Sequence, residues 1–490
     1  MDIDRRSLVL LAAAILAACY PPLSGAQGAA PSAPSSAQAW HPPASAVDEA
    51  RESVPPSDSL PASVVGRRQQ LTPDDLVSIA LQQSPETRTT WLAARAAAAS
   101  LGEARSTLFP EITGTAGINR IKTAATGGRV SAQQTTYGPS LSVNWLLLDF
   151  GGRNATIDAA RQEMFAANWN HNALVADVVR RTLQGYFAYM GARALLDAQR
   201  ASLNDAQINL DAANERRTVG VATIADVLQA RTAFAQAQLA VQQADGAAGS
   251  ARGALATLIG LPPTASFDVD TAEATAPIAE VSDTVDELIR RGLLDRPDLA
   301  AERATVDARR ADARAAHSAI YPSLSTTITG GTLWVNGGSQ TFPSYNVGLA
   351  LTIPIFNGFG WQYAAEAASL TADAETARLH TLEQQVALQV FQTWQQLRTA
   401  SQSVTTSDTL YADANQSVDA ARARYREGVG TLLELLTAES ALVNARAQRI
   451  QSRVDWHTAL VQLAHDAGRL QPSGATTLHL TTSPSAPGNH

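Results

Sequence analysis

The sequence of 490 residues contains one cysteine, Cys19. A single cysteine near the amino terminus leaves no thiol in the rest of the chain for a disulfide, for redox chemistry or for a cysteine metal site. Aromatic residues make up only 6% of the chain and charged residues only 17%, whereas alanine is very frequent. This composition favours long, closely packed helices over a bulky globular core.

Long apolar runs, basic blocks and catalytic motifs are also missing. Outside a short run near the amino terminus, no stretch offers about 18 consecutive apolar residues, which excludes a transmembrane helix. Such a chain can cross a membrane only as a closed β-barrel. The formal net charge of −8, without a basic block, argues against nucleic acid as a partner. We find no nucleophile elbow, phosphate loop or metal motif, so we expect no cofactor, no bound metal and no enzymatic activity.

The amino terminus resembles a bacterial lipoprotein signal. Two arginines precede an apolar run over residues 8–17, which is too short to span a bilayer as a mature helix. The run ends in LAAC at residues 16–19, which resembles a lipobox. This pattern predicts a signal peptide over residues 1–18 and a lipid on Cys19. Tyr20 instead of an aspartate follows the cysteine, which in lipoproteins of this kind is compatible with an anchor in the outer membrane. An ordinary signal peptide that is cut further on is the alternative.

Segments rich in proline, alanine and serine flank a structured middle. Residues 19–70 are predicted to be a disordered tether, and residues 471–490 a similar tail. Between them, two structured segments, 71–262 and 283–470, are separated by a connector at 263–282 that is rich in threonine, alanine and acids.

The stretch from Gly151 to Pro262 predicts two unusually long helices. It contains no proline before Pro262, and its alanine-rich helical pattern breaks at Gly220. Two antiparallel helices joined at Gly220 explain this pattern, with Thr223 as the N-cap of the second. At ~1.5 Å rise per residue, a helix of about 65 residues spans roughly 100 Å.

The hydrophobic period changes to that of strands before each long helix. Residues 112–121 are β-like, residues 122–134 form a polar, glycine-rich loop, and residues 137–150 alternate between apolar and polar side chains. The second half has the same pattern over residues 323–335 and 344–355. The alternation predicts strands with one apolar and one polar face, of a length that suits a tilted strand crossing a bilayer core.

Aromatic residues gather around these predicted strands. Such a cluster is typical of the aromatic belt at a membrane interface, and ordinary packing at strand ends is the alternative. The residues concerned are Tyr137, Trp145, Phe150, Trp334, Phe342, Tyr345, Phe356 and Trp361.

The second half of the chain repeats the first. The offset between matching residues is 212 positions at Pro85 and Pro297, and 208 positions at Gly220 and Gly428. The change falls in the tip of the strand hairpin, where length is least constrained. The constant register afterwards predicts a duplicated unit of two helices, a strand hairpin and a long helical hairpin.

Two strand hairpins supply four strands, which are too few to close a barrel. A symmetric oligomer must therefore close it, and a trimer would supply twelve strands. The sequence thus predicts a mainly α-helical protein with a membrane β-barrel part, a two-fold internal repeat and a hollow cylinder of paired helices.

Several segments occur in the same order in both halves. The first half carries LVSIALQQSPETR (76–88), LLLDFGGRNA (146–155) and GVATIADVLQA (220–230). Their counterparts are GLLDRPDLAAERA, PIFNGFGWQYA and YREGVGTLLELLTAES. This ordered set, present twice, resembles the TolC-like outer-membrane efflux protein family over nearly all of residues 71–470.

The resemblance implies a homotrimeric channel with a 12-stranded barrel in the bacterial outer membrane and an α-helical tunnel in the periplasm. Such a channel is the passive outer-membrane part of a tripartite export system for solutes such as drugs or metal ions, and it docks a periplasmic adaptor and an inner-membrane pump. A type I protein-secretion exit channel is one alternative. A non-channel periplasmic adaptor or coiled-coil scaffold is another, but an adaptor would show one helical hairpin, whereas this sequence shows two.

The turns of the long hairpins carry the candidate entrance residues. Gly220 and Gly428 mark the predicted periplasmic end, and Asp226 and Glu434 follow at equivalent positions. In a trimer these acids would form a ring of six carboxylates that attracts cations and holds salt bridges in a closed state. The alternative is that both are first-turn acids favoured by the helix dipole.

The resemblance further implies that Tyr425 and Glu434 belong to an entrance lock. Gly430 and Thr437 stand where the family often carries a basic residue and a second acid. Two arginines could substitute for the missing basic residue: Arg424 and Arg426.

The turns themselves are candidates for docking the periplasmic adaptor, because small residues permit a close backbone approach. A tight turn without a partner is the alternative. The candidate docking residues are Val219, Val221, Thr223, Val429 and Thr431.

Overall fold

The computed structural model describes residues 71–123, 132–270, 280–281, 283–335, 341–470 and 480–481. The predicted signal peptide, Cys19 with its lipid, the tether and most of the carboxyl-terminal tail lie outside the described residues.

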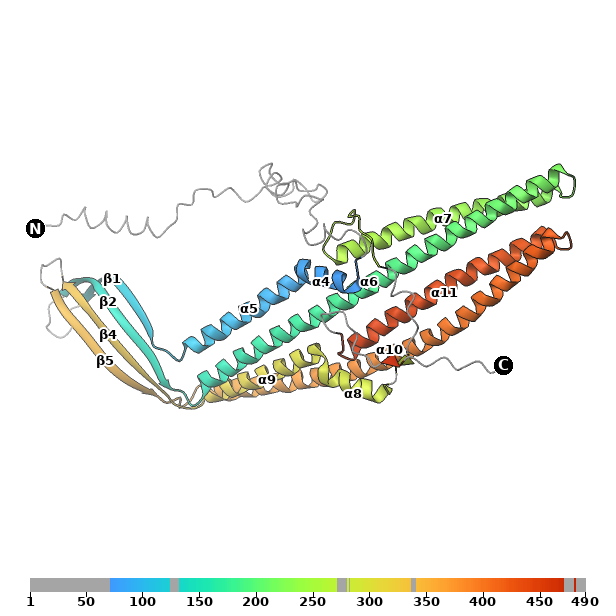
Figure 1. Ribbon diagram of the computed structural model, residues 1–490. Coiled ribbons are helices and arrows are strands. Elements are labelled where there is room, and N and C mark those ends of the chain that lie inside the picture. Colours follow the sequence, from blue (N-terminus) through green and yellow to red (C-terminus); the bar gives the residue numbers. More distant parts are fainter. Residues whose placement is uncertain are drawn as a thin grey trace, which may run out of the picture. The chain divides into compact units, whose positions relative to one another are not determined.

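The described residues form two similar runs of elements (Figure 1). The first run is α4 (Pro73–Gln83), α5 (Pro85–Ser106), β1 (Glu111–Thr123), β2 (Ala132–Leu148), α6 (Gly152–Thr218) and α7 (Ile224–Leu258). The second is α8 (Val285–Asp295), α9 (Pro297–Ser318), β4 (Ser323–Val335), β5 (Thr341–Thr352), α10 (Gly360–Arg426) and α11 (Leu432–Asp466). The short strands β3 (Glu280–Val281) and β6 (Leu480–Thr481) pair with each other.

Equivalent helices have identical lengths in the two runs. α4 and α8 have 11 residues, α5 and α9 have 22, α6 and α10 have 67, and α7 and α11 have 35. The mainly helical fold and its two-fold repeat are therefore confirmed.

Local chemistry explains where the helices begin. Thr72 caps α4, because its hydroxyl accepts the N–H of Asp75 at 3.2 Å and the Asp75 carboxylate accepts the N–H of Thr72 at 3.2 Å. A proline follows at the first helical position of α4, and prolines also open α5 and α9.

The strand boundaries differ from the predicted ones. A polar loop is predicted over residues 122–134, but β1 continues to Thr123 and β2 begins at Ala132, because these two residues pair across the hairpin. The predicted strand to Phe150 ends at Leu148, since Phe150 adopts a positive φ of 52°. In the second half, β5 covers residues 341–352 instead of 344–355.

The four long strands form one antiparallel sheet in the order β1-β2-β4-β5. Strands β1 and β5 therefore form its two margins. The α5 helix leads into β1, and β5 leads into α10, so each margin of the sheet continues into a particular helix.

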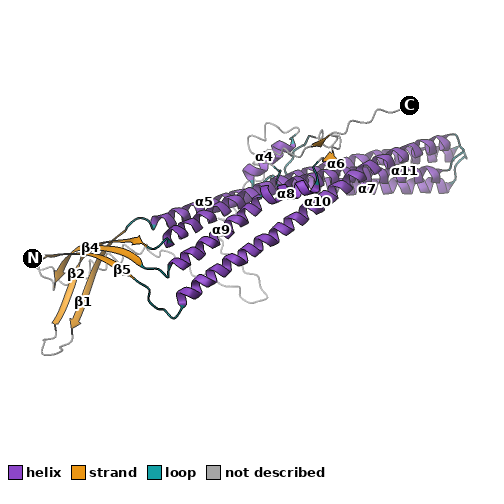
Figure 2. Ribbon diagram, turned by 90° about the horizontal axis from the view of Figure 1, so that it is seen from below, coloured by secondary structure: helices purple, strands orange, loops and turns teal. Residues whose placement is uncertain are grey.

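The helices pack in a corresponding order (Figure 2). The long helix α6 packs against α5 and α7, and also against α9 and α11, while α10 packs against α8, α9 and α11. The helix layer thus runs from α5 and α7, through α6, to α9 and α11, and then to α10. Because α6 connects β2 to the first helical turn, the sheet and that turn lie at opposite ends of a helix roughly 100 Å long.

Candidate functional site

The strand register places apolar side chains from all four strands on one face of the sheet. Ile112 pairs with Val143, Val143 with Ile328, and Ile328 with Val347. Directly paired residues lie on the same face, so these four β-branched side chains form one row across the sheet. The face is exposed: Val347 keeps 68% of its surface, and the neighbouring Tyr345 keeps 88%.

The opposite face carries small and polar side chains. The adjacent row consists of Thr113, Ser142, Thr329 and Asn346, again paired strand by strand. Because side chains alternate along each strand, the sheet has one apolar and one polar face. An exposed apolar patch across four strands indicates a surface that meets an apolar environment.

Aromatic residues pack on one another at the sheet and at its junction with the helices. The rings of Tyr137 and Trp334 stack with centroids 5.8 Å apart, and those of Phe150 and Tyr321 are 5.6 Å apart. The indole N–H of Trp145 donates to the Leu108 carbonyl at 3.0 Å. Several residues of the predicted aromatic belt therefore pack against other aromatic rings.

Arg153 fixes the passage from sheet to helix. Its guanidinium donates to the carbonyls of Thr107 and Leu147, each at 3.2 Å, so it joins the end of α5 to the end of β2. The Asp149 carboxylate accepts the N–H of Arg153 at 2.6 Å. Gly151, with a φ of 97°, makes the turn between them possible.

Gly220 and Gly428 form the turns of the two long hairpins, as predicted. Their φ angles are 79° and 75°, in the left-handed region that favours glycine. The N–H of Val221 donates to the Arg216 carbonyl at 2.9 Å, and the N–H of Val429 donates to the Arg424 carbonyl at 3.0 Å. Both long helices therefore end in the same Schellman arrangement.

Asp226 completes a capping box at the first turn. Its carboxylate accepts the N–H and the hydroxyl of Thr223, each at 2.8 Å, and its own N–H donates to the Thr223 hydroxyl at 3.2 Å. These contacts stabilise the start of α7.

Glu434 has different contacts from Asp226, although the two positions are equivalent. Its N–H donates to the hydroxyl of the N-cap Thr431 at 3.2 Å, but its carboxylate lies 3.5 Å from the guanidinium of Arg424. Arg424, one of the two arginines that could substitute for the family's basic residue, therefore contacts Glu434, the predicted entrance acid. Both side chains are well exposed, so the pair adds little stability.

Tyr425 is buried between the two hairpin tips, with 8% of its surface exposed. It belongs to a cluster, called here the tip cluster, that contains residues of α6, α7, α10 and α11. Its buried members are Ala213, Val227, Ala230, Tyr425, Leu432 and Leu435.

Arg216 is the tip residue that sequence reasoning misses. Its guanidinium lies 4.2 Å from the centre of the Tyr425 ring and donates to the carbonyls of Tyr425 at 2.8 Å and Arg426 at 3.1 Å. An arginine four residues before the turn glycine occurs in both repeats, as Arg216 and Arg424. That shared position is the signal that could have drawn attention to it.

The predicted docking residues divide into two kinds. Val219, Val221 and Val429 expose 72%, 71% and 71% of their surface, so both turns present apolar side chains. Thr223 and Thr431 are the N-caps of α7 and α11, and each hydroxyl accepts a backbone N–H of its helix. The structure thus gives both threonines a local role.

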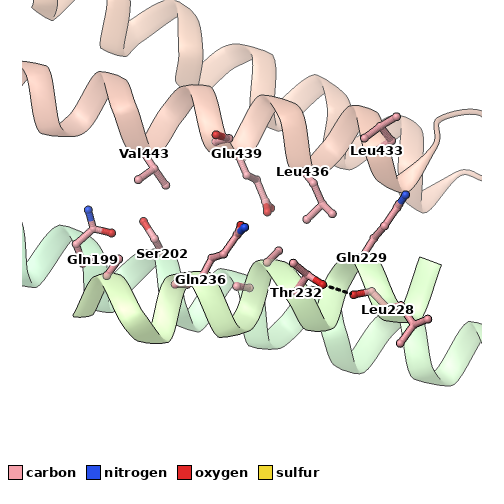
Figure 3. A pocket seen from close by; sticks show the side chains of 15 residues that line it. Gln199, Ser202, Leu228, Gln229, Thr232, Gln236, Leu433, Leu436, Glu439 and Val443 are labelled. Atoms are coloured by element: carbon pink, nitrogen blue, oxygen red, sulfur yellow. Dashed lines mark hydrogen bonds between the residues drawn. The ribbon is translucent and has the colours of Figure 1, made fainter. Parts of the chain in front are cut away.

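A groove of about 550 Å³ lies between the two hairpins beside the tip cluster (Figure 3). Apolar side chains such as Leu228, Leu433 and Leu436 line it together with amides and Glu439. The Glu439 carboxylate accepts from the Asn209 amide at 2.6 Å and contacts the Arg422 guanidinium at 3.4 Å. The contact between Asn209 and Glu439 therefore joins the two hairpins beside the groove.

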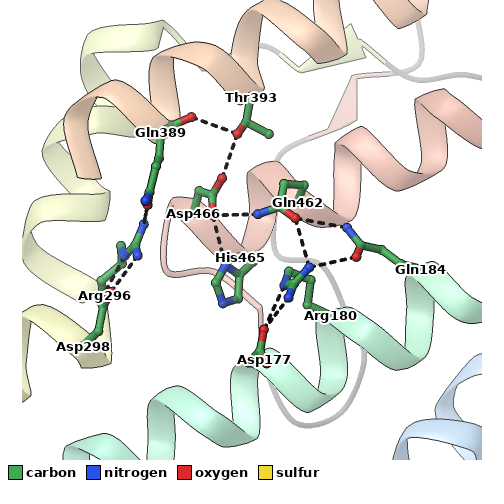
Figure 4. A network of polar contacts seen from close by, with 10 residues as sticks. All are labelled: Asp177, Arg180, Gln184, Arg296, Asp298, Gln389, Thr393, Gln462, His465 and Asp466. Carbon is green, nitrogen blue, oxygen red and sulfur yellow. Dashed lines mark hydrogen bonds and ion pairs between the residues drawn. The ribbon is translucent and has the colours of Figure 1, made fainter. Parts of the chain in front are cut away.

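A polar network joins the two repeats at the other end of α11 (Figure 4). The buried Asp466 accepts from Thr393 at 2.7 Å and from Gln462 at 2.9 Å, while Gln462 accepts from Arg180 of α6 at 3.3 Å. Burial alone would raise the pKa of Asp466, but hydrogen bonds from His465, Thr393 and Gln462 hold it below its ordinary value. The ionised carboxylate is thus the stable form at neutral pH.

His457 packs between α6 and α11 in a neutral form. Its ring stacks on Phe187 with centroids 4.3 Å apart and meets Trp456 edge-on. Burial, with a smaller effect of Arg453, lowers the pKa of His457 to about 4. The ring therefore serves as an apolar packing surface at neutral pH.

Among the helices that the structure describes, none combines the length and apolar character needed to cross a membrane.

The fold and its two-faced sheet define a class of protein in which two long helical hairpins support an antiparallel sheet with one exposed apolar face. The family model described as outer membrane efflux protein matches residues 76–261 and 288–469, one match in each repeat. The chain therefore belongs to the outer membrane efflux protein family. Membership makes it an efflux protein of the outer membrane.

Individual relatives agree with this assignment. Protein CyaE of Bordetella pertussis is 26% identical over 404 residues, covering 81% of this chain and 84% of CyaE. The pyoverdine export outer membrane protein OpmQ of Pseudomonas aeruginosa is 26% identical over 408 residues, covering 79% and 84%. The solved structure of the outer-membrane channel OprN has the same fold, with a TM-score of 0.72 and 22% identity, covering 81% of this chain and 89% of OprN.

Proposed function

We propose that three copies of this chain close into the exit channel of an export assembly, with a 12-stranded barrel in the outer membrane and a helical tunnel in the periplasm. The observation that carries this proposal is that the strands at the two margins of the sheet connect to the helices at the two margins of the helix layer. Strand β1 and helix α5 lie at one margin, and β5 and α10 at the other. Joining opposite margins of neighbouring copies would extend the sheet and the helix layer together.

Exposed apolar side chains on both margins support this assembly. On α5 these are Trp91 and Leu92, and on α10 they are Leu388 and Phe391. Strand margins also need partners, because their outward backbone groups are otherwise open to pairing. A homotrimer would cover both kinds of surface and leave the apolar sheet face toward outer-membrane lipid.

Native mass spectrometry of the protein extracted from membranes in mild detergent tests the assembly. We expect the protein in the membrane fraction and a complex of three chains. A water-soluble single chain would contradict the channel and would favour a periplasmic adaptor or scaffold.

The chain acts as a passive conduit in this proposal, without an enzymatic step. Export of a solute fits the family and the relative OpmQ, which is named for pyoverdine export. A periplasmic adaptor and an inner-membrane pump would supply substrate and energy. A deletion strain screened against drugs and metal ions, and for secreted proteins, separates solute efflux from protein secretion.

The adaptor would dock on the hairpin turns, where exposed valines, two on the first turn and one on the second, give both tips an apolar surface. A photo-crosslinker attached at Val429→Cys should capture the adaptor in cells that also express it. The same label at Gln402→Cys, an exposed position in the middle of α10, is the matched control. Equal capture from both positions, or none from Val429→Cys, would contradict docking at the tips.

The same turns would form the entrance, with Gly220 and Gly428 at its rim and Asp226, Tyr425 and Glu434 behind them. Support comes from the different contacts of the acids: the Asp226 carboxylate caps α7, whereas Glu434 faces a guanidinium. Glu434→Lys should reduce cation selectivity in single-channel recordings. Unchanged conductance and selectivity would remove Glu434 from the entrance.

Lipidation of Cys19 remains part of the proposal, because LAAC follows the apolar run. Mass spectrometry of the mature amino terminus should find a lipid on Cys19. An unmodified terminus further along the chain would refute the anchor.

A further inference from the structure

The two hairpin tips carry the same charged residues but use them differently. The offset that relates the repeats makes Arg216 equivalent to Arg424 and Asp226 equivalent to Glu434. In the second hairpin the pair closes on itself, with the Arg424 guanidinium 3.5 Å from the Glu434 carboxylate. In the first hairpin the Arg216 guanidinium instead contacts the end of α10. The symmetry of the repeat is therefore broken at this arginine.

The acids at this position of a helix divide by length in this chain: the aspartates Asp75 and Asp226 accept the N–H of their own N-cap, whereas the glutamates Glu287 and Glu434 contact arginines. Asp226 folds back on the N-cap of its own helix, where its carboxylate accepts the N–H and hydroxyl of Thr223 at 2.8 Å. Glu434 is one methylene longer, and its carboxylate extends across its hairpin to Arg424. The Asp226 carboxylate thus bonds to its own cap, whereas the Arg216 guanidinium bonds to the other hairpin.

The partner of Arg216 is well suited to a cation. The carbonyls of Tyr425 and Arg426 belong to the last turn of α10, where the helix dipole favours positive charge. The guanidinium also lies over the buried ring of Tyr425, 4.2 Å from its centre, which is a cation–π contact. The tip cluster, to which Tyr425 belongs, also brings α7 and α11 together.

We propose that Arg216 is a positioning residue that ties the first hairpin tip to the second, and that aspartate rather than glutamate at position 226 keeps it in that role. The tether holds the two turns at one spacing, so that a docking partner meets them as a single surface. This consequence rests on the proposed function, whereas the tether itself lies within one chain.

Distance measurements between spin labels test the tether directly. Labels are attached at Val221→Cys and Val429→Cys, equivalent and exposed positions on the two turns. Cys19, the only native cysteine, is changed to serine in every sample. Labelled chains are diluted with unlabelled ones, so that each complex reports one pair within one chain. The tethered protein should give one narrow distance distribution.

Two variants should broaden that distribution. Arg216→Gln removes the cation, and Asp226→Glu gives the first hairpin the acid that pairs with arginine in the second. The lost contacts should change the ratio of tethered to free tips by roughly tenfold or more. Arg216→Lys keeps a charge at the end of α10 without the planar stacking surface, so it should restore the narrow distribution in part.

Two matched controls should leave the distribution narrow. Asp226→Asn keeps an oxygen that can accept from the Thr223 N–H, and Glu434→Asp makes the reciprocal change in the other hairpin. A narrow distribution in Arg216→Gln would refute the tether. A narrow distribution in Asp226→Glu, which leaves the arginine and the tip cluster in place, would refute the role of acid length. A single chain without conductance would instead refute the proposed function, while these distances would still report the tether.

Discussion

Two neighbouring residues of β5 offer a sharp test of the two-faced sheet. Val347 lies in the apolar row and Asn346 in the polar row, so Val347→Arg and Asn346→Arg place the same charge on opposite faces at the same depth. An arginine on the lipid-facing side of a membrane strand costs about 2–4 kcal/mol near the bilayer midplane. That cost lowers the folding equilibrium constant by roughly 30-fold to several hundred-fold.

Urea titration of protein folded into lipid vesicles measures this difference. We expect Val347→Arg to unfold at much lower urea than the unmodified protein, because its 68% exposed side chain would lie in hydrocarbon. Asn346→Arg should unfold close to the unmodified protein, because its side chain lies on the polar face. Equal losses in both variants, or a larger loss in Asn346→Arg, would refute the assignment of the apolar face to lipid.

Three further predictions concern the helices. His457 has a folded pKa of about 4 against an ordinary value of 6.5, so the unfolded chain gains a proton first as the pH falls. The unfolding free energy should therefore drop by up to about 3 kcal/mol between pH 6.5 and 4. His457→Phe should remove this part of the slope in chemical denaturation, and His380→Phe, at an exposed position, should not. Gly220→Ala should lower the unfolding free energy by about 1–2 kcal/mol, because the φ of Gly220 is 79°. Gly246→Ala, inside α7 with open space around it, should raise the unfolding free energy by about 0.5–1 kcal/mol. Equal shifts of the melting temperature in the two variants would contradict this. Asp466→Asn should lower the unfolding free energy by about 1–3 kcal/mol at neutral pH. Since the folded pKa of Asp466 is depressed, its stabilisation is present above pH 3.8 and is lost as the pH falls further; a loss that stays constant down to pH 2 would contradict the ionised carboxylate.

Local chemistry made much of the fold predictable. The repeat, the long helices and the turn glycines follow from residue spacing, glycine conformation and the threonine N-cap Thr223. Helix ends depend on a few neighbouring residues, so sequence patterns describe them well. Strand ends are less predictable, because the pairing of Thr123 with Ala132 extends the hairpin into residues with no apolar alternation.

The contacts of the candidate site depend on geometry that the sequence does not display. Asp226 and Glu434 occupy equivalent positions, but one caps its own helix and the other reaches an arginine. The contact between Arg216 and Tyr425 joins residues far apart in the chain, and only the packing of the two hairpins brings them together. Alternation within each strand is likewise visible in the sequence, whereas the alignment of the four apolar faces depends on strand register.

Single-channel recording tests the central claim most directly. Purified protein, extracted as a complex in detergent, is added to a planar lipid bilayer at a low concentration. We predict discrete current steps of one characteristic size, because each inserted trimer would open one continuous path through barrel and helical tunnel. Stable complexes that insert into the bilayer and carry no current would contradict the account of this chain as an exit channel.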